Sequence, residues 1–135
     1  MTLQYGTTLR NARLDAIETV VGVSPILEIR SGAQPANCAA AASGTVLATL
    51  TLPADWLAAA SGGSKAKSGT WQDLSADATG TAGHWRIWES TLTTCHLQGS
   101  ISATGGGGDL TLDSTSLTAS QSITISTFSI TAGNP

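Results

Sequence analysis

The apolar residues of this chain change their spacing at Gly22, and this change limits the folds that the chain can adopt. Before Gly22 they recur with the period of an α-helix, and after it they alternate as in β-strands that have one buried face. We predict a helix over residues 8–21, capped by Thr7 or Thr8 and ended by Gly22 in a left-handed turn.

The predicted helix carries an apolar stripe that we expect to pack on a sheet. Leu9, Ala12, Ala16 and Val20 fall near one face, and Leu14, Ile17 and Val21 widen it. Asp15 and Glu18, together with Arg10 and Arg13, are expected on the side that faces water.

Short alternating segments follow the helix. We predict strands at 26–30, 46–52, 70–74, 84–89, 95–102 and 110–112, and a single helical turn at 55–60. Residues 61–68 form a Gly/Ser/Lys loop, by composition the most mobile part of the chain. Ile123 and Ile125 share a face but are out of phase with Phe128 and Ile130. A β-bulge at Ser126–Thr127 would restore a common face.

Seven or so short strands joined by Gly-rich turns are typical of a β-sandwich or jelly roll. A length of 135 residues suits a single domain. We therefore expect a mainly β chain, a jelly-roll-like β-sandwich with one short N-terminal helix. Residues 1–22 would form the arm and helix, and residues 23–135 the sandwich.

The composition indicates a thin core and poorly guarded strand edges. Alanine, threonine, serine and glycine supply 71 of the 135 residues, and no Lys or Arg follows Arg86. Exposed strand edges of soluble proteins are usually protected by charge, above all by lysine. We therefore expect the chain to complete its burial against copies of itself, as a dimer or trimer, or against a partner.

Several classes of partner are disfavoured. Six basic residues and a net charge of −3 leave no basic stripe for nucleic acid. No apolar run approaches the roughly 18 residues that a membrane span needs, and the first residues do not resemble an export signal. Cys38 and Cys95 could pair, but without such a signal two reduced, buried thiols are the default expectation.

The residues that could carry out chemistry do not form a recognisable set, and we expect no catalytic, metal or cofactor site. His84, His96, Cys38 and Cys95 lack the spacing of metal ligands. The run Gly105–Gly108 lacks the Lys-Ser/Thr of a phosphate loop. Asp73 and Asp77 lie where aspartate commonly accepts backbone hydrogen bonds in turns. A hydrolase is accordingly the least favoured reading.

Four of the six aromatic residues are tryptophan, a residue enriched at interface hot spots. Trp85 and Trp88 fall on opposite faces of one predicted strand, and we expect Trp85 in the core beside Ile87. We take Trp56, Trp71 and Trp88 as candidate interface anchors.

Several motifs, spread over almost the whole chain, carry a resemblance to a known family. They are NARLDAIE at 11–18, PIL at 25–27, PANCAAA at 35–41, LPADW at 52–56, SGTW at 68–71, AGHWRI at 82–87, TCHLQG at 94–99 and GGGGDLTL at 105–112. In combination they resemble a family of small virion proteins of tailed bacteriophages, most like capsid cement (head decoration) proteins.

The resemblance implies a structural protein with a jelly-roll fold and no enzymatic activity. It would be made in the bacterial cytoplasm and bind the outside of the head shell, with the major capsid protein and copies of itself as partners. Bridging of neighbouring capsomers would stabilise the shell, through the N-terminal arm and helix or an uncharged strand edge in 95–130. The alternative is a tail or fibre module that binds a host surface glycan through exposed Trp and Asp.

Overall fold

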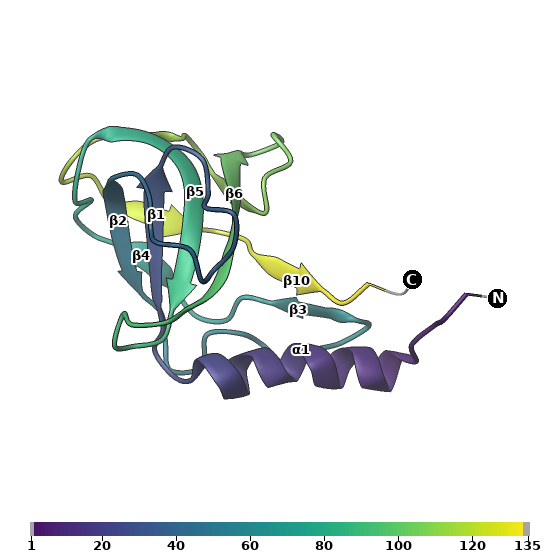
Figure 1. The fold of residues 1–135 in the computed structure, drawn as a ribbon. Helices are drawn as coiled ribbons and strands as arrows, with labels where there is room; N and C mark the ends of the chain where they lie inside the picture. The colour runs from purple at the N-terminus through teal and green to yellow at the C-terminus, as the bar shows by residue number, and fades with distance from the viewer. Residues whose placement is uncertain (1, 134–135) are drawn as a thin grey trace.

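The computed structural model describes residues 2–133 as a predominantly β structure with one helix (Figure 1). Helix α1 (Thr7–Val21) ends before Gly22, the C-cap residue, whose φ of 87° is a value that favours glycine. Its ψ of −171° lies outside the left-handed helical region, so the predicted left-handed turn is wrong. The predicted threonine cap is wrong. Gly6 is the N-cap residue, and no side chain accepts a hydrogen bond there, so the helix begins without this stabilisation.

The largest element is a curled sheet in which the strand order is β2-β1-β5-β6-β7, and β8 pairs with the start of β5. Its strands are β1 (Ile26–Ser31), β2 (Val46–Thr51), β5 (Gly80–Trp88), β6 (Cys95–Ala103), β7 (Leu110–Leu112) and β8 (Ser116–Leu117). The four longest strands lie where the sequence predicted strands, but residues on both faces of β1 and β5 are buried, so the predicted alternation with one buried face is wrong for these two strands. Strands β2, β1, β5 and β6 pair antiparallel with their neighbours, and each of the three pairings contains one register shift. Because β5 pairs with β1 and not with β2, the chain crosses over between β2 and β5.

Strands β6 and β7 pair parallel to each other although residues 104–109 alone connect them. Parallel neighbours ordinarily need a crossover of about a dozen residues or more. Here the glycine run returns directly against β6. A Cβ at Gly108 would lie 2.7 Å from Ser102 N, and one at Gly106 would lie 2.8 Å from Ser102 Oγ. Glycine at these positions therefore permits the close return.

Two short ribbons complete the β structure. Strand β4 (Trp71–Asp73) pairs with β9 (Ile123–Ile125), and β3 (Ser64–Ala66) pairs with β10 (Ser129–Thr131). The predicted bulge at Ser126–Thr127 is therefore wrong. The change of phase arises because the chain leaves one ribbon after β9 and enters the other at β10.

The core lies between the main sheet and the β4–β9 ribbon, and aromatic rings fill its centre. The centroid of the Trp71 ring lies 6.1 Å from that of Trp56 and 5.3 Å from that of Phe128. The Phe128 and Trp85 rings meet edge-on, with their centroids 5.4 Å apart. Each of these tryptophans is buried and donates its indole N–H to a carbonyl, those of Gly22, Ser68 and Ser100. The prediction that Trp85 is a core residue is confirmed.

Two predictions for the middle of the chain are wrong. No helical turn forms at 55–60; instead Leu57 makes a bridge with Lys67. The stretch 61–68 contains β3, and its Lys65 is among the most buried side chains, with 1% exposed. Pairing with β10 converts this polar sequence into ordered structure. No helix in residues 2–133 has the length and apolar character needed to cross a membrane.

Candidate docking surface on helix α1

Helix α1 is held against the body of the protein by a buried lysine. Lys65 of β3 places its Nζ 2.7 Å from Asp15 Oδ1 and 2.8 Å from Glu18 Oε2, and donates to the Ala58 carbonyl at 2.9 Å. We predicted both carboxylates on the wet side of the helix. Asp15 is indeed half exposed, whereas Glu18 is partly covered, and both reach the buried lysine. One lysine that is completely covered thus has both acidic residues of the helix as its partners.

Backbone groups of the segment before β3 complete the attachment of the helix. Asp15 Oδ1 accepts the Ala60 N–H at 3.0 Å, and Glu18 Oε1 accepts the Leu57 N–H at 3.1 Å. Nearer the start of the helix, Asn11 Oδ1 accepts the Gly63 N–H at 2.8 Å. These side chains satisfy amides that no strand pairing would otherwise reach.

The same contacts shift the proton affinities of the pair. The hydrogen bond from Lys65, followed by that from the Ala60 amide, lowers the pKa of Asp15 below its ordinary value of 3.8. Burial by itself would lower the pKa of Lys65. The hydrogen bonds and charges of Asp15 and Glu18 outweigh this effect and raise the pKa above 10.5. Both partners are therefore charged across the neutral range.

The side of the helix that carries Asn11, Asp15 and Glu18 binds the body of the protein, and the apolar stripe on the opposite side therefore faces outward. Leu9, Ala12, Ala16 and Val20 are all exposed, with 50% of Leu9 and 67% of Val20 accessible. The inner face buries only Leu14 and Val21, with Ile17 partly covered. The prediction that these four residues share a face is confirmed, but the direction predicted for that face is wrong. We call Leu9, Ala12, Ala16 and Val20 the outer helix stripe.

The outer helix stripe has the dimensions of a contact site. Its members recur at intervals of three and four residues over about 16 Å of helix, so they form one continuous row. Two further exposed apolar side chains, Leu3 and Val23, flank the helix at its two ends. Along one side, a groove of about 250 Å³ separates the helix from the start of β6. It is lined by Arg13, Ala16, Ile17, Val20, Val21, His96 and Leu97.

The predicted interface anchors lie elsewhere. Trp56 and Trp71 have no exposed surface, so the proposal that they are interface anchors is corrected: they form the core of this chain. Trp88 is half-buried on the outer side of β5, where the Arg86 guanidinium lies 5.1 Å from the centre of its ring. Of the three, Trp88 alone presents surface to a partner.

The polar residues considered for chemistry serve the fold. Asp73 Oδ2 accepts the Thr49 N–H and its Oδ1 the Ser75 N–H, both at 2.9 Å, while Asp77 accepts the Thr49 hydroxyl at 2.7 Å. The predicted role in accepting backbone hydrogen bonds is confirmed for Asp73, whereas Asp77 accepts a side-chain hydroxyl from β2. Among residues 2–133, no group of three or more His, Cys, Asp or Glu side chains is placed to hold a metal ion.

Sequence reasoning missed Lys65, the residue that orients the helix. No local signal marks it, because its two carboxylate partners lie about 50 residues earlier. Searches against protein-family models, curated proteins and solved structures found no match to this chain. The outer helix stripe, together with the sequence resemblance, is therefore the basis for a proposed function.

Proposed function

We propose that this chain is a structural virion protein of the capsid cement type, which binds the outside of a phage head shell and stabilises it by bridging capsomers. Its partners would be the major capsid protein and further copies of itself. The observation that carries the proposal is the outward-facing outer helix stripe. This surface, built on an anchored helix, is the one we assign to the shell.

The stripe is suited to a protein partner. When a partner covers large apolar side chains that are exposed to water, the free energy of association becomes more favourable by about 25 cal/mol for each Å² of apolar surface covered. Leu9 and Val20 supply that area at the two ends of the row, and the small Ala12 and Ala16 allow another backbone to approach closely between them. A partner that covers this row buries apolar surface that the isolated chain leaves exposed to water.

The strand edges are less suited to the same role. The free edge of β2 is covered within the chain, because Asp77 N and Ala78 N donate to the Leu47 carbonyl and Asp73 binds Thr49 N. This edge is therefore guarded by an internal segment and not by charge. This edge lies outside the 95–130 region in which the sequence suggested an edge contact, so the helix is preferred because of its exposed apolar stripe.

The proposed mechanism is multivalent clamping. A standard interface buries about 800 Å² per partner, which is about an eighth of the 6787 Å² that this chain exposes. Two such interfaces, one to the shell and one to another copy, would therefore occupy about a quarter of the surface. Linking copies makes each further shell contact intramolecular, so weak single contacts add up to firm attachment.

The jelly-roll relationship is part of the same proposal. The β4–β9 ribbon packs over the main sheet and gives two layers, as a sandwich has. The resemblance implies a jelly-roll fold, and we propose that these two layers are those of a jelly-roll-like sandwich.

The proposal is tested by counting copies in particles of the phage that encodes the chain. Quantitative mass spectrometry should find a number comparable to that of the major capsid protein. The double variant Leu9→Glu/Val20→Glu should fall at least about tenfold in particles, since a charge at each end of the row must be desolvated on docking. Leu74→Glu is the matched control, because Leu74 is 70% exposed and lies away from the helix.

Other results would contradict the proposal in different ways. A handful of copies per particle would move the protein to the tail and favour the glycan-binding alternative. For that alternative Trp88 is the one tryptophan with accessible surface. Absence from particles would overturn a virion role. Equal loss of Leu74→Glu and the double variant would reject the outer helix stripe as the contact.

A further inference from the structure

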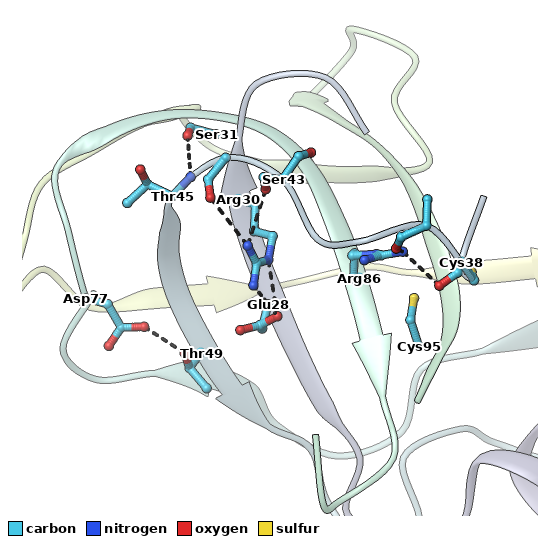
Figure 2. A network of polar contacts seen from close by, with 12 residues as sticks. Glu28, Arg30, Ser31, Cys38, Ser43, Thr45, Thr49, Asp77, Arg86 and Cys95 are labelled. Atoms are coloured by element: carbon cyan, nitrogen blue, oxygen red, sulfur yellow. Dashed lines mark hydrogen bonds and ion pairs between the residues drawn. The ribbon is translucent and has the colours of Figure 1, made fainter. Parts of the chain in front are cut away.

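Residues 32–45, which connect β1 to β2, lie over the outer face of the main sheet and are fixed there by a buried arginine. Arg86 of β5 has no exposed surface. The two N–H groups of its Nη2 are shared among the carbonyls of Asn37, Cys38 and Ala40, which lie at 3.2, 3.0 and 3.1 Å. Figure 2 shows the contact with Cys38. Three carbonyls held by one nitrogen fix the position of this stretch of backbone relative to β5.

Both ends of the connection are also closed. Ser31 N donates to the Thr45 carbonyl at 3.0 Å, and Thr45 N donates to Ser31 Oγ at 2.9 Å. Arg30 adds hydrogen bonds from its Nη1 to the carbonyls of Ser43 and Gly44. These hydrogen bonds, together with those of Arg86, fix the position of Cys38, in the middle of the connection, relative to the sheet.

This placement brings the two cysteines of the chain together. Cys95 begins β6, opposite Trp88 in the pairing register, and its side chain is directed toward the segment that carries Cys38 (Figure 2). Both thiols are free and line the same cavity, and Cys95 Sγ donates to the Leu97 carbonyl at 3.3 Å. Burial, followed by the influence of Cys38, raises the pKa of Cys95 to about 11, whereas the nearby Arg86 opposes the rise. The thiols are neighbours although 57 positions separate them in sequence.

A small oxidant can reach the pair. An open cavity of about 530 Å³ is lined by Cys38 and Cys95 themselves, with Trp88 and Thr93 among its other walls. Cys38 is partly exposed and Cys95 is buried, so the two sulfurs differ in access from solvent. An outside reagent should therefore meet Cys38 first.

We propose that Cys38 and Cys95 form a modification site, at which a low-molecular-weight disulfide such as glutathione disulfide oxidises the two thiols to an intramolecular disulfide. The bond would tie the 32–45 connection covalently to β6. This inference goes beyond the proposed function and does not depend on it, because it requires only the placement of two thiols within one chain.

The chemistry proceeds in two exchanges. The Cys38 thiolate attacks one sulfur of glutathione disulfide, forms a mixed disulfide and releases one glutathione thiolate. The Cys95 thiolate then attacks the Cys38 sulfur, forms the Cys38–Cys95 bond and releases the second glutathione. Two electrons pass from the cysteine sulfurs to the oxidant, and the two thiol protons end on the two glutathione molecules.

The experiment uses the full chain, purified under reducing conditions and then incubated with glutathione disulfide. The intact mass should fall by two hydrogen atoms, and peptide mapping should find Cys38 joined to Cys95. Dithiothreitol should reverse the change. Amide hydrogen exchange in residues 33–44 should slow by about tenfold or more in the oxidised form, because opening of the segment then strains a covalent link.

Single variants test the order of the two exchanges. Cys95→Ser should retain glutathione on Cys38 as a stable mixed disulfide, because the second thiol is missing. Cys38→Ser should react much more slowly, since its remaining thiol is buried. A disulfide-linked dimer, a stable mixed disulfide on the unsubstituted chain, or failure to oxidise under conditions that oxidise a reference dithiol would each overturn the proposal.

Discussion

Lys65 Nζ and Asp15 Oδ1 lie 2.7 Å apart, and this contact joins a buried strand to the inner face of the only helix in the described residues. The lysine side chain has 1% of its surface exposed, whereas that of Asp15 has 51%. The contact lies at the boundary between core and solvent, and together with Glu18 it determines which side of α1 faces outward.

Replacing Lys65 by methionine should loosen the helix more than it loosens the sheet. Removing the buried lysine leaves two carboxylates without their cation. Because about half of the Asp15 side chain is exposed to solvent, water partly replaces the lysine there and the loss of folding stability is smaller. We expect unfolding stability to fall by roughly 1–2 kcal/mol in urea titrations. Amides of α1 should lose protection from hydrogen exchange.

Lys67→Met provides the control for that variant. Lys67 lies two positions away, is only half-buried and donates to the Gly69 carbonyl without a carboxylate partner. Its replacement should leave the protection of α1 unchanged. Equal loosening by both variants would show that the position of Lys65 next to the helix has no special role.

The attachment of the helix should be equally strong over a broad range of pH, and it should weaken at both strongly acid and strongly alkaline pH. Because the folded pKa of Asp15 is depressed, its contribution is present above about 3.8 and is lost as the pH falls through the lower folded value. Because the folded pKa of Lys65 is raised, its contribution is present below 10.5 and is lost as the pH rises through the higher folded value. Protection of the α1 amides, measured against pH, should follow this plateau, and Lys65→Met should flatten it.

Trp71 and Trp88 should differ sharply in their effect on stability. Trp71 is fully buried between Trp56 and Phe128, so Trp71→Ala should destabilise by about 3–5 kcal/mol or prevent folding. Trp88 is half-buried against Arg86, and Trp88→Ala should lower stability by about 1–2 kcal/mol. Chemical denaturation of the two variants measures the difference; similar values would contradict the assignment of Trp71 to the core.

Gly108→Ala should detach β7 from β6. The added Cβ would meet the backbone of β6 at 2.7 Å, a distance that requires the chain to move. We expect a loss of about 1–3 kcal/mol, with chemical-shift changes in the amides of residues 101–112. Gly6→Ser is the matched control, because a Cβ there meets open space and serine is a favourable N-cap. It should be neutral or slightly stabilising.

The local elements were largely predictable from the sequence, and their relative placement was not. The apolar and aromatic residues of β1, β2, β5 and β6 locate those strands, although both faces of β1 and β5 are buried and not one face alone. Helix α1 was also correctly located. Its orientation was not, because Leu9 and Leu14 are similar in hydrophobicity, and Lys65, which decides between the two faces, lies far along the chain.

The candidate site was missed for the same physical reason. A lysine between serine and alanine in a Gly/Ser-rich stretch has the composition of a solvated loop, and it becomes a buried strand residue only when Ile130 pairs opposite it. The opposite error was made for Trp56 and Trp71, which were predicted at an interface and are buried in the core. With few large apolar residues available, the chain uses Trp56 and Trp71 to fill its own interior.

Arg10 Nε donates to the carbonyl of Ala132 at 2.9 Å, and the β3 strand that carries Lys65 pairs with β10. Helix α1 is thus supported by residues that are synthesised 122 positions after Arg10, as the adjacent α1, β3 and β10 in Figure 1 illustrate. During synthesis α1 can form early but has no complete platform to dock on. Its outer helix stripe becomes a fixed, oriented surface only after β3 and β10 have been synthesised and paired, which delays any association through that surface until then.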